Sequence, residues 1–426
     1  MISQLLIIPQ RIKGSSAKVL LRTIYGELKK LIIKSLIFRV QRKTLTFALY
    51  LIKADEKMNQ RVIISNDIQT VLTKVLQNGE YDYLFAVADD TTAQLCWSRI
   101  KDFSILHDAQ LITIPPTDIN KNLPSVTKVW TALQQGHATR HSCIINVGGG
   151  MVTDLGGFAA STFKRGIQFI NIPTTLLSMI DASVGGKTGI NFNGLKNEVG
   201  VFNDSKFVLL YAPFLQTLDK ENMLSGYAEM LKHALINTHE MLAQLLLFNW
   251  VGDIDYQQLQ QMIADSVSVK EKIVAIDPHE KGIRKALNLG HTFGHAFESW
   301  AMNMRQQHSC CSMENNAHSS HPCIKPILHG YAVAYGLVCE LYLSCIKCGF
   351  PTEVMRQVVR FIKEHYGSLP FTCNDYSALI TLMHHDKKNT GNSINCTLLS
   401  DVGQIHIDQT VSMEDIKEAL DFLREA

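Results

Sequence analysis

The sequence predicts a Rossmann-like α/β nucleotide-binding domain followed by a mostly helical domain. Residues 59–140 alternate short strand patterns with helical patterns, which indicates a parallel sheet covered by helices. An apolar strand pattern at 143–147 runs directly into a glycine triplet and then into a helical pattern from about residue 154. From about residue 212 onward the apolar positions follow helical periodicity almost throughout.

Charge is distributed unevenly along the 426 residues, which carry a formal net charge of +2. Residues 1–58 contain 12 lysines and arginines against 3 acidic residues, a net of +9, so the remaining chain carries −7. The mildly acidic net charge of residues 59–426 argues against nucleic acid as the main partner.

The basic segment over residues 1–58 has apolar runs that Lys34 and Arg39 interrupt, so it lacks the roughly 20 apolar residues of a membrane span. It also lacks a clean secretory signal. An amphipathic membrane-surface helix and a transit peptide remain open alternatives. We favour an extension outside the fold, with the folded chain starting near Met58, and expect no membrane partner.

The predicted α/β domain covers residues 59–211. Its first strands are expected at 61–65, 83–88 and 111–114, and its first helices at 68–76, 92–100 and 125–135. Asp89 follows the second strand, where open α/β sheets bind ligands. It could bind ribose hydroxyls, or it could serve only as a helix N-cap.

The predicted helical domain covers residues 212–426, with helices at 223–236, 254–276, 291–301, 331–347 and 353–365 and a strand at 397–399. Residues 302–325 are polar and contain three cysteines and three histidines, but no zinc-site spacing, so we expect a surface insertion. The ten cysteines form no disulfide pattern, and the Cys345/Cys348 pair lies in a helical pattern, so we expect core packing in a reducing cytoplasm.

The glycine triplet and the residues after it have the character of a ligand site. Glycines between a strand and a helix let a phosphate approach the backbone, and the helix N-terminus presents free N–H groups to it. A tight turn without a ligand would need no polar neighbours. Here the neighbouring apolar segment contains many polar positions: Thr174, Thr175, Asp181, Lys187, Lys196 and Asn197.

Three segments of the helical domain carry potential metal ligands. Glu229 precedes Lys232 by three residues, and His291 precedes His295 by four, so each pair shares a helix face. His329 comes just before a long apolar helix. One glutamate and two histidines would suit a catalytic zinc ion with open positions, although each alone could be a buried polar residue.

Six cations lie within or next to these motifs, which indicates an anionic substrate with, for example, a phosphate and a carboxylate. They are Arg165, Lys187, Lys196, Lys232, Lys270 and Arg284.

In chain order, the motifs GGGxxxD, RGI, PTTLL, DASVGGKTGIN, SGxAExxK, LNxGHxxGHAxE and HG resemble the 3-dehydroquinate synthase family of sugar phosphate cyclases. The resemblance runs from about residue 61 to the C-terminus and is close over 148–201 and 225–295. The glycine turn alone would also fit the glycerol dehydrogenase and iron alcohol dehydrogenase group.

The resemblance implies a dehydroquinate synthase-like fold, a homodimer, NAD, and zinc that cobalt could replace, with Glu229, His291 and His329 as metal ligands. It implies NAD contacts at Asp118, Lys121, Gly149, Gly150, Met151, Asp154, Thr174, Thr175, Lys187, Lys196, Phe214, Leu215, Gln216 and Thr217. To these predicted cofactor contacts we add Asp89, from its position after the second strand. It implies substrate contacts at Arg165, Asp181, Lys187, Lys196, Asn197, Lys232, Lys270, Arg284, Asn288, His295 and Lys387. Catalytic roles are implied for Lys187, Lys232, Glu280 as proton acceptor, and His295 as proton relay.

The implied reaction converts 3-deoxy-D-arabino-heptulosonate 7-phosphate into 3-dehydroquinate and phosphate in the shikimate pathway. It proceeds by transient oxidation, β-elimination, reduction and aldol closure. The alternatives are a sister cyclase acting on sedoheptulose 7-phosphate, a metal-dependent polyol dehydrogenase, and a degenerate binding protein. The sequence departs from the family at Tyr331, where glutamate is common, and at Thr91, where asparagine is usual. The C-terminal phosphate contact is placed at Lys387 or Lys388, or at Asn395.

Overall fold

The computed structural model describes residues 60–193, 195–250, 253–311, 326–384 and 393–426. The chain divides into two compact units, Met1–Met58 and Asn59–Ala426, and every described residue belongs to the second. The predicted extension over 1–58 therefore lies outside the described residues, as does Lys387.

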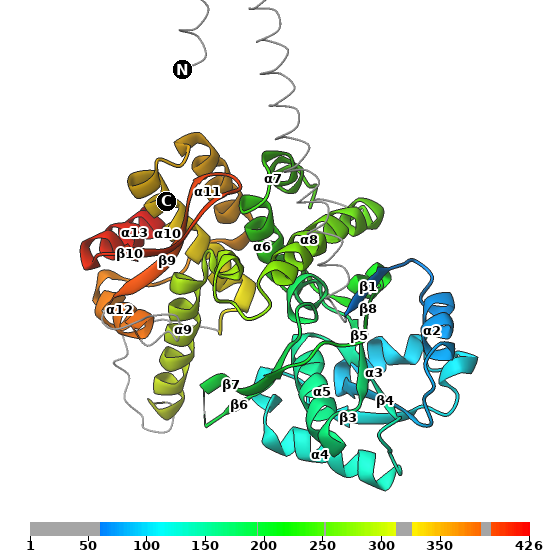
Figure 1. Cartoon of the computed structure of the whole chain (residues 1–426). Helices are drawn as coiled ribbons and strands as arrows, with labels where there is room; N and C mark the ends of the chain where they lie inside the picture. The colour runs from blue at the N-terminus through cyan, green and yellow to red at the C-terminus, as the bar shows by residue number, and fades with distance from the viewer. Residues whose placement is uncertain (1–59, 194, 251–252, 312–325, 385–392) are drawn as a thin grey trace, which may run out of the picture. The chain divides into compact units, whose positions relative to one another are not determined.

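A six-stranded parallel sheet, with strand order β1-β8-β5-β4-β2-β3, confirms the predicted α/β architecture (Figure 1). Neighbouring side chains of β2 alternate between two cores, because Phe85 and Val87 join one apolar cluster and Ala86 joins the other. The strands are β1 (Arg61–Ile64), β2 (Leu84–Asp89), β3 (Gln110–Ile114), β4 (Cys143–Gly148), β5 (Gln168–Pro173) and β8 (Phe207–Leu210), and the helices between them are α2 (Ile68–Gln77), α3 (Asp90–Leu95), α4 (Leu123–Gln135) and α5 (Gly150–Thr162).

The glycine triplet lies where the connections of this sheet diverge. The chain leaves β2 toward the edge strand β3 and leaves β4 toward β5, so the crevice between β2 and β4 is the expected ligand position. Gly149 is the N-cap of α5. The helix thus begins four residues before the predicted start at Asp154, because the triplet supplies both the turn and the first helical residue.

Between β5 and β8 the chain forms a separate antiparallel hairpin, β6 (Lys187–Phe192) and β7 (Leu195–Phe202). The sequence interpretation missed this hairpin although an Asn-Gly dipeptide, a strong hairpin signal, stands at 193–194. The hairpin carries the predicted site residues Lys187, Lys196 and Asn197. It also exposes apolar side chains: Phe192, Leu195, Val199, Val201 and Phe202.

The second part of the unit is mostly helical, as predicted, and shares the larger apolar core with the sheet. One helix, α10, is long and apolar enough to cross a membrane, with mean hydropathy 1.3, but 67% of that window is buried among other helices. The elements are α6 (Lys220–Leu235), α7 (His239–Leu246), α8 (Tyr256–Ile276), α9 (His291–Cys311), α10 (His329–Cys348), α11 (Thr352–Tyr366), α12 (Tyr376–His384), β9 (Ile394–Asp401), β10 (Gln404–Val411) and α13 (Met413–Glu425).

Three predictions of element bounds, two in this part and one in the α/β part, need correction. Residues 302–311 of the predicted surface insertion continue α9, because polar residues such as glutamine and arginine favour a helix as well as a loop. The helix predicted at 92–100 is α3, which ends at Leu95, followed by a short 3₁₀ turn. The strand predicted at 397–399 is the centre of a longer hairpin strand, β9.

Candidate active site

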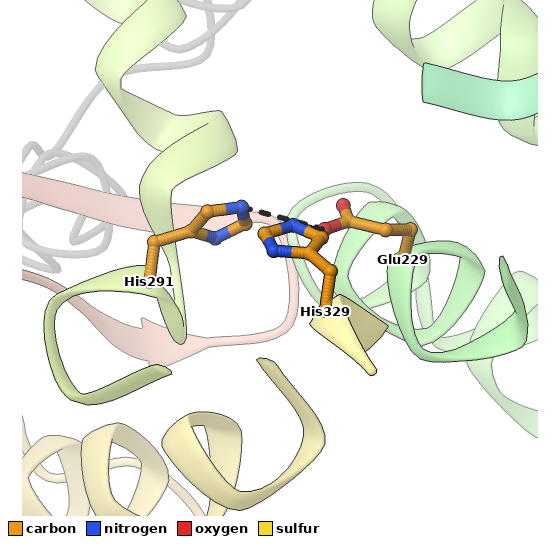
Figure 2. Close-up of side chains that lie close together, drawn as sticks. All are labelled: Glu229, His291 and His329. Atoms are coloured by element: carbon orange, nitrogen blue, oxygen red, sulfur yellow. Dashed lines mark ion pairs between the residues drawn. The ribbon is translucent and has the colours of Figure 1, made fainter. Parts of the chain in front are cut away.

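Glu229, His291 and His329 come from three helices and point toward one another, as Figure 2 shows. His291 Nε2 lies 3.3 Å from Glu229 Oε1, and His329 Nε2 lies 3.4 Å from the same oxygen. Glu229 is fully buried, whereas His329 is partly open to solvent. The three side chains thus form a group of one oxygen and two nitrogen donors that a ligand could reach from the His329 side.

Close helix packing brings these three residues together. His291 and His329 are the first residues of α9 and α10. A Cβ atom at Gly330 would stand 1.8 Å from the Ser225 carbonyl oxygen of α6, and a Cβ at Gly336 would stand 1.9 Å from the Gly290 carbonyl oxygen. Only glycine therefore lets α10 approach both the helix that carries Glu229 and the start of the helix that carries His291.

Glu340 fixes the start of α9 from the neighbouring helix α10. Its carboxylate is fully buried and accepts hydrogen bonds from the backbone N–H of Gly290 (2.7 Å) and of Thr292 (3.2 Å). A carboxylate at a helix N-terminus satisfies free N–H groups and complements the helix dipole. Glu340 therefore holds in place the turn from which His291 projects.

The donor set fits a tetrahedral zinc ion. Ligands at about 2.0–2.2 Å from such an ion stand about 3.3–3.6 Å from one another. The two measured oxygen–nitrogen separations, 3.3 and 3.4 Å, agree with that spacing. Both Glu229 oxygens are shielded from solvent, and their charged neighbours are Lys232 at one oxygen and the two histidines at the other.

Without an ion, the charges around Glu229 balance through ion pairs. Burial opposes ionisation, but the Lys232 ammonium and His291 hold the pKa of Glu229 well below its usual range. Burial also opposes charge on His329, yet hydrogen bonds to Glu229 and Glu298 raise the pKa of this imidazole to about 10. A bound cation would take the place of the imidazole proton.

A second group of potential ligands shares Glu229 and adds Asp181 and His233. Asp181 Oδ1 is already bound by the Lys270 ammonium at 2.5 Å, and Lys232 lies beside Glu229. The Lys270 ammonium would repel a divalent cation at this second position. The first group is therefore the better candidate for a metal site.

His233 is buried beside this cluster, and its Nδ1 lies 2.7 Å from Ser266 Oγ. Burial and the nearby Lys232 charge lower the pKa of His233 to about 3, from 6.5 in an unfolded chain. The unfolded state therefore binds one extra proton between these pH values, and the stability that neutral His233 contributes is full above about pH 6.5 and lost as the pH falls toward 3.

Between pH 7 and pH 5 this single group should cost the native chain about 2 kcal/mol of unfolding free energy. The His233→Asn variant retains an amide near Ser266 but cannot titrate. Urea unfolding of the metal-free chain at both pH values should give a pH difference smaller by about that amount in the variant. Equal differences for variant and wild type would show that His233 is not the group responsible.

Three buried cations, Lys232, Lys270 and Arg284, lie close to one another near the metal donors. Lys270 donates to the Asp181 carbonyl and carboxylate, each at 2.5 Å, and Lys232 pairs with Glu229. Burial lowers the pKa of Lys270, and Lys232 and Arg284 lower it further, because like charges repel. Arg284 itself donates to the carbonyls of Pro278 (2.6 Å) and Gly185 (3.1 Å) and so joins two loops. A bound anion would relieve this repulsion.

The predicted catalytic pair Lys187 and Glu280 forms an ion pair at the edge of this region. Glu280 also accepts a hydrogen bond from Asn288 Nδ2 at 2.8 Å. Glu280 has a left-handed backbone, with φ of 57°, which strains a non-glycine residue. Asp277 stabilises this loop by accepting from the backbone N–H groups of Lys281, Gly282 and Arg284.

The predicted cofactor residues Asp118, Lys121 and Asp154 form one charged cluster with Asn197. Lys121 Nζ lies 3.1 Å from Asp154 Oδ2, 3.4 Å from Asp118 Oδ1 and 2.6 Å from Asn197 Oδ1. Burial raises the pKa of Asp154 to about 6, against the effect of Lys121. Because Asp154 belongs to the first turns of α5, this cluster lies beside the glycine turn, where a dinucleotide would need polar partners.

The other predicted cofactor residues lie around the same strand ends. Thr174 donates its backbone N–H to the Gly148 carbonyl at 3.0 Å, and Thr175 follows it. Asp89 is the N-cap of α3, and its side chain accepts a hydrogen bond from the backbone N–H of Thr92 at 2.8 Å, which confirms the helix-cap alternative. The contact of Asp89 with a ribose stays a prediction. The segment after β8 contains the buried side chains of Phe214 and Leu215, followed by Gln216 and Thr217.

Among the remaining predicted residues, Arg165 lies apart from these clusters, whereas His295 lies beside the metal donors. Arg165 is exposed in the short 3₁₀ turn that follows α5, and the 13 residues of α5, about 20 Å of helix, separate that turn from the glycine turn. His295 lies one turn after His291, with its ring 5.4 Å from the His291 ring and 6.1 Å from the His329 ring. Asn395, the alternative to Lys387, lies on β9, where its carbonyl accepts from Thr292 Oγ1 at 3.1 Å. Tyr331 packs edge-on against Tyr366.

The sequence interpretation missed Glu298, which binds both Lys196 and His329. Its position seven residues after His291 was the available signal, since i and i+7 share a helix face. It also missed Glu340 and Asp277, whose roles depend on contacts between elements that no local pattern reveals.

Family models match most of the described unit. The model for the N-terminal part of 3-dehydroquinate synthase matches residues 111–225, and the model for its C-terminal part matches residues 226–313 and 310–389. The 3-dehydroquinate synthase of Parabacteroides distasonis is 49% identical over 368 residues, which cover 86% of this chain and 98% of that one. The 3-dehydroquinate synthase of Campylobacter concisus is 36% identical over 315 residues, covering 73% and 83%.

Solved structures agree on the fold. A 2-deoxy-scyllo-inosose synthase in complex with carbaglucose-6-phosphate, NAD+ and Co2+ superposes with a TM-score of 0.68 at 21% identity, covering 86% of this chain and 96% of that one. The 2-epi-5-epi-valiolone synthase of Streptomyces hygroscopicus, with NAD+ and Zn2+ bound, gives 0.68 at 22% identity, covering 87% and 98%. From the family models and the identities over most of its length, the chain belongs to the 3-dehydroquinate synthase family.

Proposed function

We propose that this chain converts 3-deoxy-D-arabino-heptulosonate 7-phosphate into 3-dehydroquinate and phosphate, using NAD and zinc. The observation that carries the proposal is the convergence of Glu229, His291 and His329 beside the buried cations Lys232 and Lys270. A metal-dependent dehydrogenase of a neutral polyol would not need these buried cations, with Arg284 close to them, next to its metal.

Glu229, His291 and His329 would hold the metal ion, and the residues around the β2–β4 crevice would hold the dinucleotide. When bound, zinc lowers the pKa of a coordinated hydroxyl, and NAD accepts and later returns a hydride. The chain's own contribution would be to position the substrate between these two sites. The hydrogen bond from Lys121 to Asn197 supports this role, because it ties the cofactor side to the hairpin that carries Lys187 and Lys196.

The cations would bind the two anionic groups of the substrate. Lys270 and Arg284 are buried and donate hydrogen bonds to protein oxygens, so these contacts hold their positive charges in fixed positions. Glu280, held between Lys187 and Asn288, is placed to accept a proton, and His295 beside the metal donors is placed to relay one. These residue roles are proposals from position and chemistry.

One assay of the purified chain with NAD+ and zinc distinguishes the proposed activity from the alternative enzyme activities. The proposed reaction releases phosphate from the heptulosonate substrate without net NADH, whereas a polyol dehydrogenase would accumulate NADH. A sister cyclase would turn over sedoheptulose 7-phosphate instead. Lys270, Arg284, Asn288 and His295 together favour the substrate that carries a carboxylate.

We also propose a homodimer in the cytoplasm. The exposed apolar side chains of the β6–β7 hairpin, among them Phe192, Leu195 and Phe202, would lose contact with water if a second copy covered them. Sedimentation equilibrium should give twice the chain mass, and a single-chain mass at micromolar concentration would rule the dimer out.

Residues 1–58 are proposed to lie outside the catalytic fold. A chain that begins at Met58 should keep the kcat and KM of the full chain within about twofold, because the match to the Parabacteroides distasonis relative takes 368 residues, a number that residues 59–426 alone can supply, and covers 98% of that relative. Loss of phosphate release in the shortened chain would assign the segment a catalytic or folding role.

A further inference from the structure

Glu298 lies between the metal donors and the cofactor-side cluster, and it shares one face of α9 with His291 and His295. The three residues stand at i, i+4 and i+7, so their side chains project in the same direction. Only 8% of Glu298 is exposed. A carboxylate buried to this extent is costly unless its oxygens have charged or hydrogen-bonding partners.

One oxygen of Glu298 faces a proposed metal ligand. Oε2 lies 3.4 Å from Nδ1 of His329, and the opposite nitrogen of that ring, Nε2, lies 3.4 Å from Glu229 Oε1. A neutral imidazole has one N–H and one lone pair. If Nδ1–H donates to Glu298, the lone pair of Nε2 faces the Glu229 side, where the ion would sit.

The other oxygen of Glu298 binds Lys196. Oε1 accepts a hydrogen bond from Lys196 Nζ at 2.6 Å, and the same ammonium lies 3.5 Å from Asp118 Oδ2. Lys196 belongs to β7 of the hairpin, whereas Glu298 and His329 belong to α9 and α10. A single carboxylate therefore connects the hairpin to the helices that carry the metal donors.

We propose that Glu298 is a positioning residue that sets two groups at once. One oxygen fixes the tautomer and orientation of His329, and the other holds the Lys196 ammonium where it can meet an anionic group of the substrate. The substrate part of this inference rests on the proposed function, whereas the metal part concerns only this chain's own residues. Glu298 itself touches neither substrate nor ion.

The test compares zinc affinity and steady-state kinetics in Glu298→Gln, which keeps the side-chain shape and removes the charge. Competition with a chromophoric chelator should give zinc binding about 10–100-fold weaker than in wild type, as expected for the loss of a carboxylate behind a ligating histidine. The matched control is Glu364→Gln, the same change on the exposed side of α11, which should leave zinc affinity unchanged.

Lys196→Met separates the two roles of Glu298. It should raise KM and leave zinc affinity unchanged, whereas Glu298→Gln should change both. In the double variant, zinc affinity should equal that of Glu298→Gln, and KM should rise less than the product of the two single effects, because both variants disrupt the same contact. Wild-type zinc affinity in Glu298→Gln, or fully multiplicative KM effects, would overturn the proposal.

Glu298→Asp provides a second variant if the glutamine variant does not fold. Aspartate keeps the charge but is one methylene shorter, so it cannot reach both partners, and we expect zinc affinity or KM to change by at least about threefold. An aspartate variant with wild-type values for both would also contradict the proposal. If wild type released no phosphate, the proposed function would fail, but the zinc titration would still test the link to His329.

Discussion

Replacing Glu229 by glutamine should abolish tight zinc binding and lower kcat/KM by at least about a thousandfold. Glutamine has nearly the same shape, so the change isolates the charge. The loss should exceed the 10–100-fold expected for a residue behind a ligand, because Glu229 is itself a proposed donor whose oxygen lies 3.3 and 3.4 Å from the two histidine nitrogens.

The same variant should lower the free energy of unfolding of the metal-free chain by about 3–5 kcal/mol. Glu229 and Lys232 are both fully buried and form an ion pair, so removing one charge leaves the other uncompensated in the interior. The double variant Glu229→Gln with Lys232→Met should recover part of that stability but no zinc binding. A single variant that kept one zinc ion per chain would show that the metal assignment is wrong.

Replacing Lys270 by methionine should produce the second largest effect, a loss of roughly 30- to 5,000-fold in kcat/KM. Removing one partner of a buried hydrogen-bonded charge pair costs about 2–5 kcal/mol. Lys270 is buried and donates to Asp181, and we propose that it also meets the substrate carboxylate. The loss should appear mainly in KM, because a contact to a remote anionic group acts on the bound substrate before and during reaction.

The effect of Lys270→Met should be accompanied by a rise in the pKa of Asp181. In the wild-type chain, burial favours the neutral form of Asp181, but Lys270 and Lys232 hold the pKa of this carboxyl below its usual range. The control is Lys285→Met, which removes a cation that pairs with Asp408 in a more exposed position and should change kcat/KM by less than threefold. Equal losses in the two variants would indicate a general charge effect rather than a specific contact.

Sequence patterns predicted the parts of this fold that local chemistry determines. Strand β4, the glycine turn and α5 were predictable because an apolar run followed by three glycines has few other structures. The proposed metal donors Glu229, His291 and His329 stand on three different helices, so no local spacing connects them. They were predictable as a group through the order of the motifs and the family resemblance.

The remaining features depend on contacts between distant residues. Glu340 acts on the start of α9 from 50 residues away, and Glu298 meets Lys196 across 102 residues. Neither contact leaves a local pattern. The polar composition of residues 302–311 hid a continuing helix, because glutamine and arginine fit both a helix and a loop.

We propose that one site in this chain combines a metal ion, a dinucleotide and an anionic sugar substrate. Phosphate release from 3-deoxy-D-arabino-heptulosonate 7-phosphate tests it most directly, measured with and without NAD+ and with and without a chelator, while absorbance at 340 nm follows NADH. We predict phosphate release that requires both NAD+ and the metal, with no net NADH. Phosphate release that persisted after complete removal of NAD+ or of the metal, or NADH accumulation without phosphate, would show that the chain does not work in this way.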